Sequence, residues 1–119
     1  MRPAFAEDAI DLSAGAEEYR NHCAVCHGEA GDGPLAESMT VEVPGLTQIS
    51  ANNDGRFPVV EILEIIDGRT GVRGHGYPMP VWGKRFRAEA DETWGPIALE
   101  TITRQRLLEL TFYLQTIQK

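Results

Sequence analysis

The sequence predicts an all-α protein with three main helices and long connecting loops. Apolar residues recur at helical spacing in the segments 59–66 and 107–117, and a further helix is expected over 13–23. No segment alternates apolar and polar residues in the manner of a half-buried strand. The helices are separated by loops rich in glycine and proline, above all 28–34 and 68–83. Such long loops do not build a core by themselves, so we expect something other than the helices and loops to fill the centre of the fold.

The first two helices have local signals at their ends. Ser13 is a favourable N-cap for the first helix. Pro58 suits the first turn of the second, and Gly68 stands where a C-terminal cap belongs. The last helix is expected to begin near Thr103. These signals set the predicted boundaries.

The composition fits one folded domain. The chain has 119 residues, of which 42% are hydrophobic and 24% charged. Its net charge of −7 argues against nucleic-acid binding, which relies on Lys and Arg. No apolar stretch approaches the ~20 residues of a membrane span. We expect residues 1–12 to form a flexible N-terminal segment, residues 13–119 to form the domain, and the protein to be a monomer.

The charge is unevenly distributed. Residues 68–87 contain five basic side chains and no acidic one, whereas the chain as a whole is acidic. This basic segment is read in two ways: as a solvated loop, or as a docking patch or a set of counter-charges for a bound anion.

Both cysteines lie in Cys23-Ala24-Val25-Cys26-His27, which has the spacing of a c-type haem attachment site. Two thiols near the end of a helix can add to the two vinyl groups of one porphyrin, and the next residue, His27, can then bind the iron. A thioredoxin-like pair would need a βαβ context, and a zinc site would need a further ligand pair. A plain disulfide would leave the histidine without a role. We therefore predict that one covalent haem c, with its iron, fills the centre of the fold and that the loops enclose it.

The sixth iron ligand is predicted to be Met79. It is bracketed by Pro78 and Pro80, which stiffen the backbone and could hold a weak thioether ligand in place. His75 is the rival ligand. Met39 is read instead as an ordinary loop residue.

The chain from Gly15 onward resembles the class I c-type cytochromes. Gly15 and Tyr19 look like the family's glycine–aromatic pair on the first helix, and Leu110, Tyr113 and Leu114 are similar to the last-helix residues that cross it. The resemblance implies the cytochrome c fold, with loops wrapped around one covalently attached haem.

The resemblance also implies two roles at the iron. Pro34 would supply the carbonyl that accepts the Nδ1 hydrogen of His27, and Met79 stands at the position of the axial methionine. Tyr77 and Trp82 are further candidates, as hydrogen-bond donors to the haem propionates. The stretch 85–102 departs from simple members of the family.

His/Met ligation leaves no open position at the iron, which suits electron transfer and not catalysis. We therefore expect a one-electron carrier between a donor and an acceptor redox protein, and not an enzyme. Two alternatives stay open: a haem subunit of a larger dehydrogenase or oxidase complex, and a peroxidase or sensor with a labile methionine. Haem attachment on the exporting side of a membrane, together with the small-x-small triplet 4–6, predicts a periplasmic protein whose signal peptide has been removed.

Overall fold

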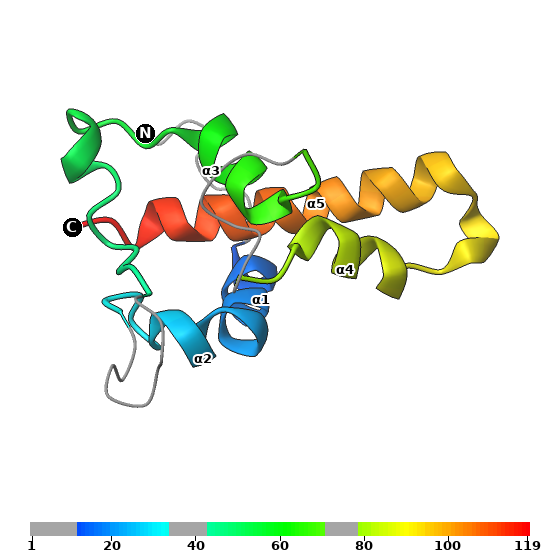
Figure 1. Ribbon diagram of the computed structural model, residues 1–119, viewed down its shortest axis with the longest axis horizontal. Helices are drawn as coiled ribbons and strands as arrows, with labels where there is room; N and C mark the ends of the chain where they lie inside the picture. Colours follow the sequence, from blue (N-terminus) through cyan, green and yellow to red (C-terminus); the bar gives the residue numbers. More distant parts are fainter. Residues whose placement is uncertain (1–11, 34–42, 71–78) are drawn as a thin grey trace, which may run out of the picture.

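The computed structural model describes residues 12–33, 43–70 and 79–119, and these ranges contain helices and no strand (Figure 1). The all-α prediction is therefore confirmed. In chain order the elements are the α-helices and 3-10 helices α1 (Ser13–His22), α2 (Ala24–His27), η3 (Ala51–Asn53), α3 (Val59–Asp67), α4 (Trp82–Glu89), η4 (Glu92–Trp94) and α5 (Pro96–Thr116).

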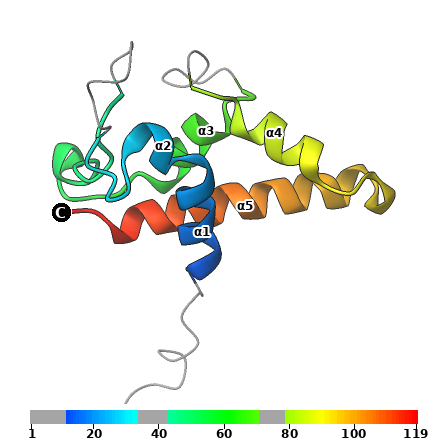
Figure 2. The same cartoon turned by 90° about the horizontal axis from the view of Figure 1, so that it is seen from below.

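Helix α5 is the element on which the others pack. It runs through the length of the molecule in both views, and it contacts α1, α3 and α4 (Figures 1 and 2). The buried core lies along its inner face, where aromatic and aliphatic side chains from α1, α3 and α4 meet it; its members are Tyr19, Cys23, Ile66, Trp82, Phe86, Leu107, Leu110 and Leu114. One long helix thus holds the parts of the chain that surround the core.

Helix α1 crosses α5 at the place that the sequence predicts. Gly15 lies against the backbone of α5, and the rings of Tyr19 and Tyr113 are 5.2 Å apart between centroids. Tyr19 is fully buried in this crossing. The helix begins at Ser13, but the N-cap is Leu12, so Ser13 is not the capping residue.

Helix α3 has the predicted apolar stripe and the predicted end. Pro58 is its N-cap, and Gly68 terminates it with φ of +71°, a left-handed conformation that glycine adopts without a Cβ penalty. The stripe of this helix faces the interior through Ile62 and Ile66.

The start of the last helix was predicted wrongly, and helix α4 was not predicted. The last helix begins at Pro96 and not near Thr103, because Gly95 with φ of +82° turns the chain and proline suits the first helical turn. Helix α4 was missed, because charged residues fill half of it. Only the pair Trp82 and Phe86, one turn apart and both buried, marks its inner face.

No helix in the described ranges is long and apolar enough to cross a lipid bilayer.

Candidate haem site

The two cysteines and the histidine lie on one compact turn. Cys23 ends α1, and the four-residue helix α2 follows directly and contains Cys26 and His27. Because the cysteines are three residues apart, their thiols lie on neighbouring positions of the same helical turn. They are not disulfide-bonded. Cys23 is buried, and Cys26 is partly exposed. This arrangement allows both sulfur atoms to bond to one flat cofactor.

The turn is closed by a tight reversal at Gly28. Its φ is +86°, and a Cβ at this position would collide with the carbonyl of Gly33. The hydroxyl of Tyr19 donates a hydrogen bond to the carbonyl of Gly28, at 2.7 Å. The end of the Cys-x-x-Cys-His turn is therefore fixed to α1 by a buried side chain.

The imidazole of His27 is oriented by a backbone carbonyl. His27 is 3% exposed, and its Nδ1 lies 2.9 Å from the carbonyl oxygen of Pro44. A carbonyl only accepts hydrogen bonds, so Nδ1 carries the hydrogen and Nε2 keeps its lone pair for a metal ion. Burial lowers the pKa of His27, against a smaller opposing effect of the Pro44 bond. Burial has the larger effect, so the ring is favoured in its neutral form, with Nε2 available as a ligand.

The prediction that Pro34 supplies this carbonyl was wrong. Pro34 itself lies outside the described residues, and the single Nδ1 hydrogen is directed to Pro44. Gly33 and Leu46 are also joined to this turn: Gly33 N donates to His27 O, and Leu46 N donates to Gly31 O. The segment 44–46 therefore lies against the Cys-x-x-Cys-His turn, and this position brings Pro44 to the imidazole.

A cavity of about 250 Å³ opens at His27 and reaches Met79. Apart from these two residues it is almost wholly apolar, with walls from the 44–49 loop, α3 and α5; the lining residues are Cys23, His27, Pro44, Gly45, Leu46, Ile49, Ile62, Ile65, Ile66, Met79, Leu110 and Leu114. A thiol, an imidazole and a thioether thus meet in one apolar space. This donor set fits a haem held by a thioether bond and two axial ligands.

Trp82 is the buried polar side chain that still needs a partner. It is 6% exposed and belongs to the same buried cluster as Cys23, yet its Nε1 has no hydrogen-bond acceptor among the described residues. An unsatisfied buried N–H costs free energy, so an acceptor is expected there. The predicted role of Trp82 at the cofactor is compatible with this position. Tyr77 lies outside the described residues.

The cavity walls include residues that the sequence analysis did not single out. Leu46 and Ile49 come from an irregular loop, and Ile62, Ile65 and Ile66 come from α3. The stripe on α3 was recognised as a buried face, but nothing in a helical pattern shows whether it faces other side chains or a cofactor.

The zinc alternative gains no support. In the part of the chain that the structure describes, no group of three His, Cys, Asp or Glu side chains is placed to hold a metal ion.

Two of the five basic side chains of the segment 68–87 are paired with acidic groups within the fold. Arg69 forms ion pairs with Asp67 and Glu100, and Arg87 forms one with Glu100 at 2.8 Å. Arg85 lies over the ring of Trp82, 5.2 Å from its centroid. These acidic partners lie outside residues 68–87. The count of basic residues in the segment therefore overstates the positive electrostatic potential that it presents.

Comparisons with known proteins show the family of this chain. The cytochrome c family model matches residues 12–118. The chain is also similar to the cbb3-type cytochrome c oxidase subunit CcoP of Azospirillum brasilense, with 36% identity over 79 residues. That match covers 66% of this chain and 24% of the relative, so the chain spans about a quarter of the length of the curated relative it matches. No solved structure matches the chain at a significant level.

The family match covers the helices, the Cys-x-x-Cys-His turn and the walls of the cavity together. The recognition made from the sequence is confirmed, and haem-based electron transfer follows as the general role. The chain belongs to the cytochrome c family and carries a covalent haem c, for which its two cysteines, Cys23 and Cys26, have the Cys-x-x-Cys-His spacing.

Proposed function

We propose that this protein is a one-electron carrier whose haem iron is bound by His27 and Met79. The observation that carries the proposal is that these two side chains line one apolar cavity next to Cys23. The bond from His27 to Pro44 fixes one ligand, and the proline on each side of Met79 restricts the backbone of the other.

When bound, the haem supplies an iron that cycles between Fe(II) and Fe(III). The protein supplies two axial ligands, so no position is left for a substrate. A thioether ligand favours Fe(II), and the apolar walls of Ile62, Ile66 and Leu110 keep water away from the additional charge of Fe(III). Both effects raise the reduction potential relative to a haem with two histidine ligands in contact with water.

We further propose that Trp82 donates its Nε1 hydrogen to an acceptor on the bound haem, and that Tyr77 contacts the same group. The support for Trp82 is its burial and its unpaired N–H in the described structure. Trp82→Phe keeps most of the apolar ring and removes the donor. The reduction potential of this variant should change, whereas that of Trp94→Phe, which makes the same replacement at the exposed tryptophan of η4, should stay close to wild type.

A second candidate function is a haem subunit of a larger oxidase. It is favoured by the similarity to CcoP, a subunit of such a complex. Both candidates need a redox protein as donor and another as acceptor, and neither needs this chain to transform a substrate.

We propose that the protein lies in the periplasm, where haem attachment to a Cys-x-x-Cys-His site is completed.

The visible spectrum of the oxidised holoprotein tests the ligands. His/Met ligation gives a weak far-red iron–sulfur band, and Met79→Ala should abolish it. Met39→Ala is the matched control, because it removes a methionine that we do not assign to the iron. Absence of the band in the wild type, its survival in Met79→Ala, or a high-spin wild-type spectrum would contradict the carrier proposal.

Purification of the native protein separates the two candidates. A free carrier elutes alone and retains its haem. A subunit co-purifies in constant ratio with a catalytic protein.

A further inference from the structure

The chain between α4 and the start of α5 forms a projecting tip with exposed apolar side chains. We define the hairpin tip as residues 89–98, which lie at the opposite end of α5 from the C-terminus (Figures 1 and 2). Trp94 is 70% exposed and Ile97 is 84% exposed. Two large exposed apolar side chains within four residues are typical of a contact surface.

The hairpin tip holds these side chains on an ordered backbone. Oδ1 of Asp91 accepts hydrogen bonds from the backbone N–H and the hydroxyl of Thr93, at 2.9 and 2.8 Å. Gly95 N donates to Glu92 O, and Leu99 N donates to Gly95 O. Because the backbone is already fixed, little conformational entropy is lost when the tip is bound.

The hairpin tip is also acidic. Residues 88–103 contain no Lys or Arg, and the exposed Asp91 and Glu92 immediately precede Thr93 and Trp94. The bonds from Thr93 lower the pKa of Asp91, so its carboxylate is charged at neutral pH. An occupant that fits this tip must therefore offer apolar walls together with basic groups.

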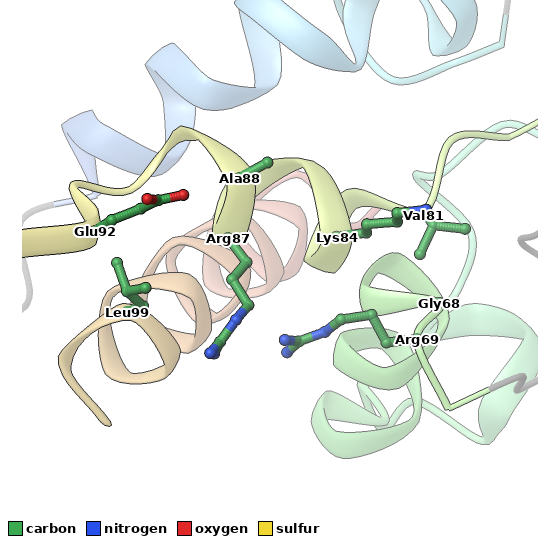
Figure 3. A pocket seen from close by; sticks show the side chains of 8 residues that line it. All are labelled: Gly68, Arg69, Val81, Lys84, Arg87, Ala88, Glu92 and Leu99. Carbon is green, nitrogen blue, oxygen red and sulfur yellow. The ribbon is translucent and has the colours of Figure 1, made fainter. Parts of the chain in front are cut away.

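The same molecule has a groove with that chemistry. A hollow of about 690 Å³ lies between α4, the start of α5 and the end of α3 (Figure 3). Val81, Ala88 and Leu99 give it apolar walls, and Arg69, Lys84 and Arg87 add positive charge. Glu92 of the hairpin tip lies at the edge of the same hollow, so acidic and basic groups share one surface. The volume is within the range of ~300–1,000 Å³ that accepts a small-molecule-sized group, and an indole ring is smaller than that.

The basic groups of the groove are not all committed to internal ion pairs. The guanidinium groups of Arg69 and Arg87 approach each other in Figure 3, and both bind Glu100. Arg87 uses only one nitrogen for this, and Lys84 has no ion pair in the described part of the chain. Lys84 and the remaining N–H groups of Arg87 are thus available to a carboxylate from outside.

We propose that the hairpin tip of one copy docks in the groove of a second copy, and that the second copy does the same in return. Because tip and groove belong to the same helical hairpin, a two-fold axis makes both contacts at once. In this arrangement the axis lies beside Ala88, and Lys84 of one copy faces Glu92 of the other. Alanine at the axis permits a close approach of the two α4 helices.

The groove lies beside the haem cavity, because its residues Gly68 and Val81 are each two positions from the cavity residues Ile66 and Met79. A tip docked there lies next to the chain that carries Met79. The proposal does not depend on the carrier function, and it replaces the expectation of a monomer drawn from the sequence.

Sedimentation of the holoprotein over a range of concentrations tests the dimer through two charge reversals. Lys84→Glu and Glu92→Lys each make both contacts of the pair repulsive, so each variant alone should dimerise at least about tenfold more weakly than wild type. In an equimolar mixture of the two variants, every tip–groove contact again joins opposite charges. The mixture should therefore dimerise to within about threefold of wild type.

The controls separate a specific contact from a change in net charge. Arg20→Glu and Glu61→Lys make the same charge changes at exposed positions of α1 and α3, and neither should change the dimer. Trp94→Ala should weaken it by at least about tenfold, with an unchanged circular dichroism spectrum. A monomer at all concentrations, a dimer insensitive to these variants, or a mixture no better than its parts would each overturn the proposal.

Discussion

Gly15 of α1 lies directly against the carbonyl oxygen of Glu109 in α5. A Cβ built at Gly15 would overlap with this oxygen and would come 3.1 Å from the Cβ of Tyr113. The helices therefore touch through their backbones at this point. Their close approach also brings the ring of Tyr19 onto that of Tyr113 and places the haem-attachment turn beside α5.

The first prediction concerns this crossing. Gly15→Ala should lower the free energy of unfolding by about 2 kcal/mol, because a backbone carbonyl cannot move aside as a side chain can. The better helix propensity of alanine offsets only up to ~1 kcal/mol of the crowding. Denaturant titration of the holoprotein measures the loss. Arg20→Ala on the exposed side of α1 should change stability by less than about 0.5 kcal/mol, and an equal effect at both positions would contradict the prediction.

The second prediction concerns the hydrogen bond from Tyr19 to Gly28. Tyr19→Phe leaves the carbonyl of Gly28 without this donor and should cost about 1–2 kcal/mol of stability. Tyr113→Phe removes the same atom from the neighbouring ring, which does not make this bond, and should cost less. The midpoints of denaturant unfolding, compared at equal slope, give the difference. If the two variants are equally stable, the bond does not hold the turn in place.

The third prediction is a loss of stability in acid. Three arginines, Arg69 first, lower the pKa of Glu100 from 4.5 to about 2. A carboxyl group whose pKa is lowered by folding stabilises the folded state above its unfolded pKa. This contribution is lost as the pH falls from about 4.5 towards 2. Because Glu100 is partly solvated, we expect it to be about 1–2 kcal/mol.

Glu100→Gln isolates this contribution. The variant should be less stable than wild type at pH 7, and the difference should shrink as the pH falls below 4. Glu61→Gln, at an exposed site on α3, is the control and should follow the wild-type profile. A gap between wild type and Glu100→Gln that stays constant from pH 7 to pH 3 would rule out Glu100 as the source.

The sequence was most informative where chemistry or periodicity is local. The Cys-x-x-Cys-His turn lies within five residues, and the stripe of α3 ends at its own glycine, so both could be recognised without knowledge of the fold. Helix α4 could not, because half of its residues are charged and two of these, Arg87 and Glu89, pair with residues far away in the sequence. Arg87, for example, binds Glu100 on another helix.

The wrong prediction of the carbonyl that accepts from His27 has a different cause. The acceptor for His27 is a backbone carbonyl, and every residue has one, so side-chain identity gives no signal. Pro34 and Pro44 both follow the histidine in the sequence, and the bond spans 17 residues to the later one. Only the path of the chain decides between them, and that path depends on the contacts made by residues 44–49.

The last prediction concerns the residue that holds this loop. Gln118, just beyond α5, donates to the carbonyls of Leu46 and Leu114 through Nε2 and accepts from the backbone N–H of Ser50 through Oε1. Leu46 and Leu114 line the haem cavity. The amide of Gln118 thus joins the end of the chain to one wall of the cavity, next to the loop that orients His27.

Gln118→Ala removes all three bonds. We expect the amide of Ser50 to exchange its hydrogen at least about tenfold faster, because opening of the loop becomes cheaper by more than ~1.4 kcal/mol. Water should enter the loosened wall more often and stabilise the additional charge of Fe(III), so the reduction potential should fall. Gln115→Ala, exposed on α5, removes an equal side chain and should change neither quantity. Faster exchange with an unchanged potential would show that the loop holds the fold but does not shield the iron, whereas no change in exchange would remove Gln118 from both roles.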